Sequence, residues 1–131
     1  VIIANLNGVF LNITIVAVVA WKISNSFDVT VANPPHWVDF DCGSVKNIKG
    51  FTYLPRQNSN NGNIKKYTIQ ISNDDKTWSK PVVEGEFENN RKEKSILLTT
   101  PVKARFIRFT ALSEQNGQDF AAGAEFKVLE K

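Results

Sequence analysis

The chain has 131 residues, which suits one domain and is too short for two ordinary ones. Hydrophobic residues make up 42% and charged residues 22%, as in a globular protein, and the net charge of +3 is too small to indicate a nucleic-acid partner. The single cysteine excludes an internal disulfide and a thiolate metal cluster, and the single histidine argues against a histidine-based catalytic or zinc centre. We therefore predict one domain over residues 1–131.

The longest mostly apolar run lies near the start of the chain, at residues 9–20 (VFLNITIVAVVA). It is shorter than the ~20 residues that a membrane-spanning helix needs, and it contains Asn12 and Thr14. The run ends in small residues, like a signal-peptide cleavage site, but no basic segment precedes it. We expect a buried strand here and no membrane span.

Apolar and polar residues alternate from residue 36 onward, which is typical of half-buried strands. In RFIRFTAL, for example, Ile107, Phe109 and Ala111 fall on one face. Clusters of Asn, Asp, Gly and Pro separate these stretches, and no window shows a helical stripe. We expect strands at 37–41, 47–54, 67–72, 81–87, 94–99, 105–112 and 124–128.

Many short strands without a long helix predict an all-β fold, a β-sandwich of jelly-roll type. The longest predicted loops are 55–63 and 113–123. Binding groups are commonly found in loops at the end of such a sandwich.

Five stretches together resemble the factor V/VIII type C (discoidin-like) domains, and in particular the family 32 carbohydrate-binding modules. They cover about 95 residues: PPHWVDFDCG (34–43), IKGFTYLPRQ (48–57), NGNIKKYTIQISNDDKTW (61–78), ARFIRF (104–109) and AAGAEFKVL (121–129). The family fold is a β-sandwich of jelly-roll type, in agreement with the periodicity. The resemblance implies sugar binding.

Sugar recognition needs an aromatic ring for the apolar face of a pyranose and donors and acceptors for neighbouring hydroxyls. The guanidinium of Arg56 can bridge two hydroxyls, and Asn61 offers both a donor and an acceptor. Phe120 is an aromatic residue in a polar loop, suited to stacking. In similar modules, residues at these three positions bind the sugar. The alternatives are a loop ion pair for Arg56, a tight turn for Asn61 and a core cap for Phe120.

Other residues of the same stretches are better explained by structure than by recognition. We expect core packing for four aromatic residues: Phe51, Tyr67, Trp37 and Trp78. We interpret Arg105 and Arg108 as a structural ion pair and a solvated face, and His36 as structural.

The N-terminal part departs from the family pattern. Similar modules carry a run like DGDxxTxW, which helps to bind a structural calcium, and a sugar-contacting His after the Trp. This chain has TIVAVVAW followed by Lys22, and valine offers calcium only its backbone carbonyl. Glu125 matches the family's C-terminal calcium ligand. Calcium at Glu125 and a sugar contact from Lys22 are therefore expectations that rest on the resemblance alone.

The resemblance implies a non-catalytic module that binds galactose-type or N-acetylhexosamine-type sugars. Its partners would be a glycan and an attached glycoside hydrolase, in a monomeric chain that is secreted, periplasmic or at the cell surface. A membrane- or protein-binding discoidin domain is the alternative, although the loops are rich in Asn, Ser, Gln and Asp. A hydrolase would need paired carboxylates from the set Asp39, Asp41, Asp74, Asp75 and Glu125.

Overall fold

The computed structural model describes residues 2–6, 9–13, 19–21, 36–57 and 59–131, the first three segments as paired strands only. The described residues contain strands and no helix: β1 (Ile2–Leu6), β2 (Val9–Ile13), β3 (Val19–Trp21), β4 (His36–Leu54), β5 (Lys66–Ser72), β6 (Val83–Glu86), β7 (Lys94–Ala111), β8 (Ala121–Gly123) and β9 (Glu125–Glu130). None of the described residues forms a helix long and apolar enough to cross a membrane.

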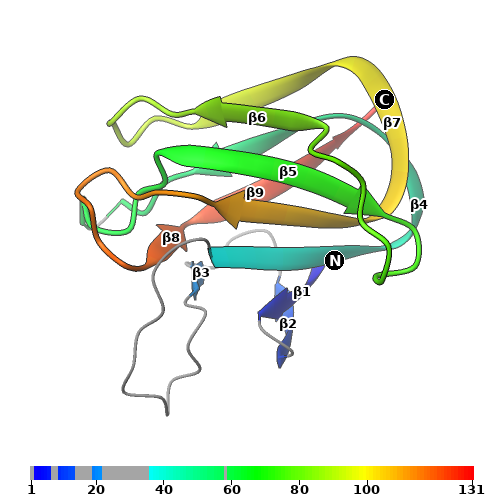
Figure 1. The fold of residues 1–131 in the computed structure, drawn as a ribbon, viewed down its shortest axis with the longest axis horizontal. Helices are drawn as coiled ribbons and strands as arrows, with labels where there is room; N and C mark the ends of the chain where they lie inside the picture. The colour runs from blue at the N-terminus through cyan, green and yellow to red at the C-terminus, as the bar shows by residue number, and fades with distance from the viewer. Residues whose placement is uncertain (1, 7–8, 14–18, 22–35, 58) are drawn as a thin grey trace.

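Two long strands, β4 and β7, build both layers of the sandwich. They pair antiparallel along their lengths, but the register breaks between Asp41 and Lys46 and again between Ile48 and Gly50. Figure 1 shows both strands turning at the same end of the molecule. Gly43, with φ at +81°, supplies the left-handed residue that the turn of β4 contains.

Each half of these strands therefore belongs to a different layer. One layer has the order β2-β1-β4-β7-β5-β6, with the first half of β4 beside the second half of β7. The other layer places the second half of β4 between the first half of β7 and β9. A separate two-stranded sheet joins β3 to β8.

The core lies between the layers and is built on aromatic contacts. Phe126 of β9 stacks on Phe40 with 4.6 Å between ring centroids and on Phe109 with 4.8 Å. Tyr67 stacks on Phe87 at 4.1 Å. The predicted alternation in β7 is confirmed, because Ile107, Phe109 and Ala111 are buried.

The predicted strands are confirmed in position, but the predicted number of strands is wrong, because two pairs of predicted strands are continuous. The stretches 37–41 and 47–54 are one strand, β4, and 94–99 and 105–112 are one strand, β7. Of the stretch 124–128, residues 125–128 belong to β9 and Ala124 lies between β8 and β9. Within the apolar run 9–20, residues 9–13 form β2 and residues 19–20 belong to β3, whereas 14–18 lie outside the described residues.

Candidate functional site

Three loops meet at one end of the sandwich, on the left of Figure 1, and we call them the loop rim: residues 55–65, 87–93 and 112–120. They follow β4, β6 and β7 respectively. The start of β4 reaches the same end, because the His36 ring donates through Nε2 to the main-chain carbonyl of Asp119. His36 is buried, which confirms its structural interpretation.

The loop after β4 is closed at both ends against β8. At its start, the Ala124 amide donates to the Leu54 carbonyl at 2.8 Å, and at its end the Ala122 amide donates to the Gly62 carbonyl at 2.7 Å. The Tyr53 hydroxyl, whose pKa is raised by burial, donates to the Ala122 carbonyl. The two ends of the loop after β4, at Leu54 and Gly62, are therefore both held against β8 and Ala124.

The buried carboxylate of Glu114 joins this loop to the loop after β7. Its Oε1 accepts the Gly62 amide at 3.0 Å, and its Oε2 accepts the amides of Asn116 at 2.9 Å and Gln118 at 2.6 Å. Both oxygens are thus occupied by backbone donors, and only 5% of the residue is exposed. Glu114 acts as a tie between the two loops.

A chain of amide contacts continues across the surface of the rim. Asn116 Nδ2 donates to the Asn60 carbonyl at 3.1 Å and to Asn61 Oδ1 at 3.3 Å. Arg91, from the loop after β6, donates through Nε to Asn60 Oδ1 at 3.1 Å and through Nη1 to the Gln57 carbonyl at 2.9 Å. Gln57 Nε2 returns a bond to the Arg91 carbonyl at 3.0 Å. All three loops are therefore tied to one another.

The aromatic ring of Phe120 lies directly over Gly62. A Cβ on Gly62 would come within 2.7 Å of Phe120 Cε2 and 2.8 Å of Ala122 Cβ, so only glycine fits beneath the ring. The φ of +89° at Gly62 also favours glycine. Gly62, which directly follows Asn61 in the chain, therefore packs against the half-buried Phe120 ring.

The structure places three of the four predicted sugar-binding residues at the loop rim. Asn61 is exposed and Phe120 and Arg56 are half-buried, with Arg56 in the loop that closes on β8. Lys22 lies outside the described residues, although β3 ends one residue earlier, with Trp21 opposite Ala121. Sugar binding by these four residues remains a prediction.

The expected calcium ligand, Glu125, contacts a lysine. Its carboxylate lies 3.3 Å from Lys127 Nζ, which also approaches Glu93 at 3.5 Å. Within the described residues, no group of three His, Cys, Asp or Glu side chains is placed to hold a metal ion. The side chains of 13–20 lie outside the described residues, and calcium binding at Glu125 remains a prediction.

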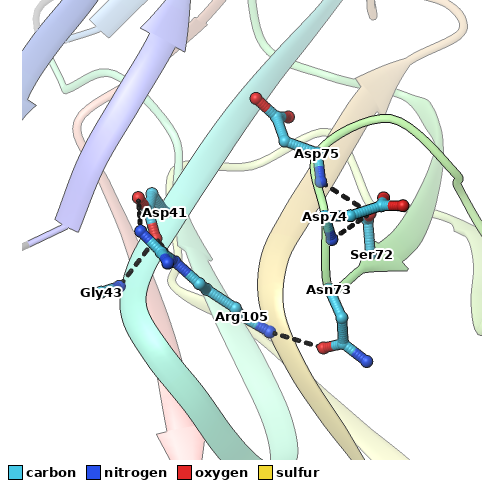
Figure 2. A network of polar contacts seen from close by, with 7 residues as sticks. All are labelled: Asp41, Gly43, Ser72, Asn73, Asp74, Asp75 and Arg105. Carbon is cyan, nitrogen blue, oxygen red and sulfur yellow. Dashed lines mark hydrogen bonds and ion pairs between the residues drawn. The ribbon is translucent and has the colours of Figure 1, made fainter.

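Two ion pairs lie on the outward face of β4 and β7, away from the core. Asp39 binds Arg108 through both oxygens at 2.7 and 2.9 Å, and Asp41 binds Arg105 at 2.8 and 2.9 Å. The Arg105 guanidinium lowers the pKa of Asp41 (Figure 2). Both arginines form ion pairs, which confirms the ion-pair interpretation, and the Arg105 side chain is also 42% exposed to solvent.

The core prediction holds for Phe51 and Tyr67, which are buried, but it is wrong for Trp37 and Trp78. Both indoles are half-buried and flank the Arg108 guanidinium, at 5.2 Å for Trp37 and 4.2 Å for Trp78. The reason lies in the alternation, since Val38 and Phe40 point inward and Trp37 shares the outward face of Asp39. A guanidinium on that face gives each ring a stacking partner.

The remaining acidic residues of the hydrolase hypothesis form a turn at the opposite end of the sandwich. Asp74 Oδ1 accepts the Ser72 hydroxyl at 2.9 Å and the amides of Lys76 and Thr77, which lower its pKa to about 2. Asp75 adopts a φ of 61° with its amide on Ser72 Oγ (Figure 2). Asp39, Asp41 and Asp74 are thus engaged by arginines or a turn, an arrangement that gives the hydrolase hypothesis no support.

The fold and the rim define a class: a small antiparallel β-sandwich with interlocked polar loops at one end. The F5/8 type C domain model matches residues 19–126, and the chain belongs to this family. Over 95 residues it is 39% identical to a sialidase of Micromonospora viridifaciens, and over 99 residues it is 35% identical to a galactose oxidase of Gibberella zeae. These matches cover 72% and 74% of this chain, but the chain spans only 14% of each relative.

Solved structures of carbohydrate-binding modules share the fold. A Clostridium perfringens family 32 module in complex with GalNAc-β-1,3-galactose superposes with a TM-score of 0.74 at 28% identity, over 86% of this chain and 74% of that one. The family 32 module of C. perfringens NanJ, in complex with galactose, has a TM-score of 0.69 at 21% identity, over 98% of both chains. The β-sandwich predicted from the alternation is confirmed.

Sequence reasoning missed the residues that hold the rim together, namely Glu114, Asn116 and Arg91. The asparagines were recognised only as turn formers, and nothing in the local pattern separates Glu114 from an exposed acid. The spacing of 52 residues between Gly62 and Glu114 gives no signal of their contact.

Proposed function

We propose that this chain is a non-catalytic carbohydrate-binding module that holds a galactose-type or N-acetylhexosamine-type sugar at the loop rim. The observation that carries the proposal is the packing of the Phe120 ring against Gly62, the residue after Asn61, in a loop that also contains Arg56 and closes on β8. A ring for stacking next to donors for neighbouring hydroxyls is what pyranose recognition requires. The sugar-bound modules of the same fold support it.

The module would serve a larger enzyme. The curated relatives are a sialidase and a galactose oxidase, and the matched part is 14% of each. A single shallow sugar site binds weakly, and attachment to an enzyme raises the effective concentration of the glycan near the catalytic domain. We propose a glycoside hydrolase as the attached enzyme and a secreted, periplasmic or cell-surface location, where glycans are found.

The membrane- or protein-binding alternative finds no support at the described rim. The exposed large apolar side chains among the described residues are Val45, Leu97 and Leu112, of which Leu112 alone belongs to the loop rim. Insertion into a membrane needs apolar tips gathered on the loops. The rim surface carries Asn60, Asn61 and Asn116 instead.

Isothermal titration calorimetry with galactose, N-acetylgalactosamine and N-acetylglucosamine tests the proposal. We expect saturable binding of at least one of the three, and competition between those that bind. Absence of binding to these sugars and to a broad glycan array, together with co-sedimentation on liposomes, would support the discoidin-like alternative.

A further inference from the structure

The hydrogen bonds of the loop rim leave donors directed to solvent while they engage the acceptors of the same residues. Asn60 shows this first. Its main-chain carbonyl accepts from Asn116 Nδ2, and its side-chain Oδ1 accepts from Arg91 Nε. Both Asn60 oxygens thus already accept a hydrogen bond from the protein itself.

The same contacts fix the orientation of the Asn61 amide. The Asn60 carbonyl can only accept, so Asn116 must turn its NH₂ group toward it, and that NH₂ also meets Asn61 Oδ1 at 3.3 Å. Asn61 Nδ2 donates no hydrogen bond to the described residues and is the part of this exposed side chain left for a ligand. Asn61 therefore presents donors.

Arg91 adds a cation whose described contacts are all neutral. A guanidinium has five N–H donors, and the contacts with Asn60 and Gln57 use two of them, so three remain. Arg105 and Arg108 each bind an aspartate, but Arg91 forms no ion pair with any described residue. Lys92, the next residue, is exposed and also lacks an ion pair among the described residues.

Four carboxylates of the rim and of β9 are engaged elsewhere. Glu93 and Glu125 approach Lys127, Glu114 is covered by backbone amides, and Glu88 accepts from Asn90 at 3.2 Å. An unpartnered acceptor of the loop, Asn63 Oδ1, is shielded from solvent and out of reach of a ligand. Arg91 therefore keeps N–H donors that none of these four carboxylates contacts.

We propose that the ligand is an acidic glycan, a galactose-type sugar bearing a carboxylate or a sulfate, and that Arg91 binds the anionic group. This inference rests on the proposed function, because Arg91 is coupled to Asn61 through Asn60. The guanidinium is held in place by Asn60 and Gln57 before the ligand arrives, which lowers the entropy lost on binding. Its remaining N–H groups form a planar fork that matches two oxygens of a carboxylate or sulfate.

The test is calorimetry with methyl galactoside, methyl galacturonide, the methyl ester of that galacturonide, and galactosides sulfated at O3 or O6. We expect at least one anionic sugar to bind about tenfold or more tightly than its neutral counterpart, with the advantage shrinking between about 0.05 and 0.5 M salt. The carboxylate and sulfate arms identify which group is bound. In Arg91→Gln the advantage should fall below about twofold, whereas Lys80→Gln, which removes a charge at the opposite end of the sandwich, should retain it.

Each other outcome is decisive. Equal binding of acid and ester, and of sulfated and plain galactosides, overturns the acidic-glycan inference but leaves the proposed function intact. Equal loss of neutral and anionic binding in Arg91→Gln shows that Arg91 only clamps the loops. Absence of binding to every sugar overturns the proposed function itself. If Arg91→Gln does not fold, the affinities for the galacturonide and for its methyl ester are compared in the unaltered chain and in Arg91→Lys. This comparison still tests whether the anionic group of the sugar is bound.

Discussion

Glu114 Oε1 accepts the backbone N–H of Gly62 at 3.0 Å, although the two residues are 52 positions apart in the sequence. The other carboxylate oxygen holds the amides of Asn116 and Gln118 in the loop after β7. One buried carboxylate thus sets the distance between the loop that carries Asn61 and the loop that carries Phe120. The geometry of the proposed sugar site depends on this tie.

Replacing Glu114 by Ala should therefore loosen both loops. Three buried or partly buried N–H groups lose their acceptor, and we expect the free energy of unfolding to fall by about 2–4 kcal/mol. Urea denaturation monitored by tryptophan fluorescence measures the change. Glu88→Ala is the matched control, because that acid is exposed and contacts only Asn90. Equal free energies of unfolding for the two variants would contradict the claim that the Glu114 carboxylate holds the two loops together.

Gly62→Ala tests the close approach of Phe120. The variant combines a strained φ of +89° with a Cβ placed 2.7 Å from Phe120 Cε2, and we expect a loss of about 2–3 kcal/mol and weaker sugar binding. Gly117→Ala isolates the backbone cost, since its φ is +74° and no atom lies within 4 Å of a Cβ there. Gly117→Ala should cost about 1 kcal/mol. The account of Gly62 fails if both substitutions have the same effect.

The turn at Asp74 should make stability depend on acidity. Its folded-state pKa of about 2 lies below the usual 3.8, because the amides of Thr77 and Lys76 stabilise the carboxylate. This contribution is present above the unfolded pKa and is lost as pH falls through the folded pKa. We expect the melting temperature to drop between about pH 4 and pH 2, and to drop less in Asp74→Asn. Parallel pH profiles for the two proteins would show that Asp74 does not contribute.

Calcium at Glu125 is tested by thermal melting with and without a chelator. If a cation binds there, a chelator lowers the melting temperature of the unaltered chain but not that of Glu125→Gln. Any cation must compete with the Lys127 ammonium at 3.3 Å, so we expect millimolar rather than micromolar affinity. An unchanged melting temperature in the presence of the chelator would contradict calcium binding at Glu125.

The fold was predictable because strand periodicity is local. Val38 and Phe40, like Ile107 and Phe109, alternate with polar residues and are buried as expected. The continuity of β4 through Gly43 was not predictable, since a bend with broken register interrupts the alternation and looks like a loop between two strands. Trp37 was assigned to the core on residue type, although its place in the alternation already pointed outward.

The candidate site was only partly predictable from the sequence, because the sequence shows residue types and loop positions but not the contacts between loops. Arg56, Asn61 and Phe120 were found because their residue types and loop positions suit a sugar, and the resemblance supplied their roles. The contacts that orient them join separate loops, as in the pair Arg91 and Asn60, and no sequence period encodes such a pair. Only the structure shows that Oδ1 of the Asn61 amide is occupied, which leaves the NH₂ group to face a ligand.

Sugar binding at the loop rim is tested most directly by titration calorimetry of Arg56→Ala and Phe120→Ala beside the unaltered chain, using the sugar that the unaltered chain binds best. We expect Arg56→Ala to weaken binding by about 10- to 100-fold, because charge-assisted hydrogen bonds to neighbouring oxygens are lost. Phe120→Ala should weaken it about tenfold through lost stacking, with the circular dichroism spectrum unchanged. Unchanged affinity in both folded variants would place the site away from this rim and contradict the account.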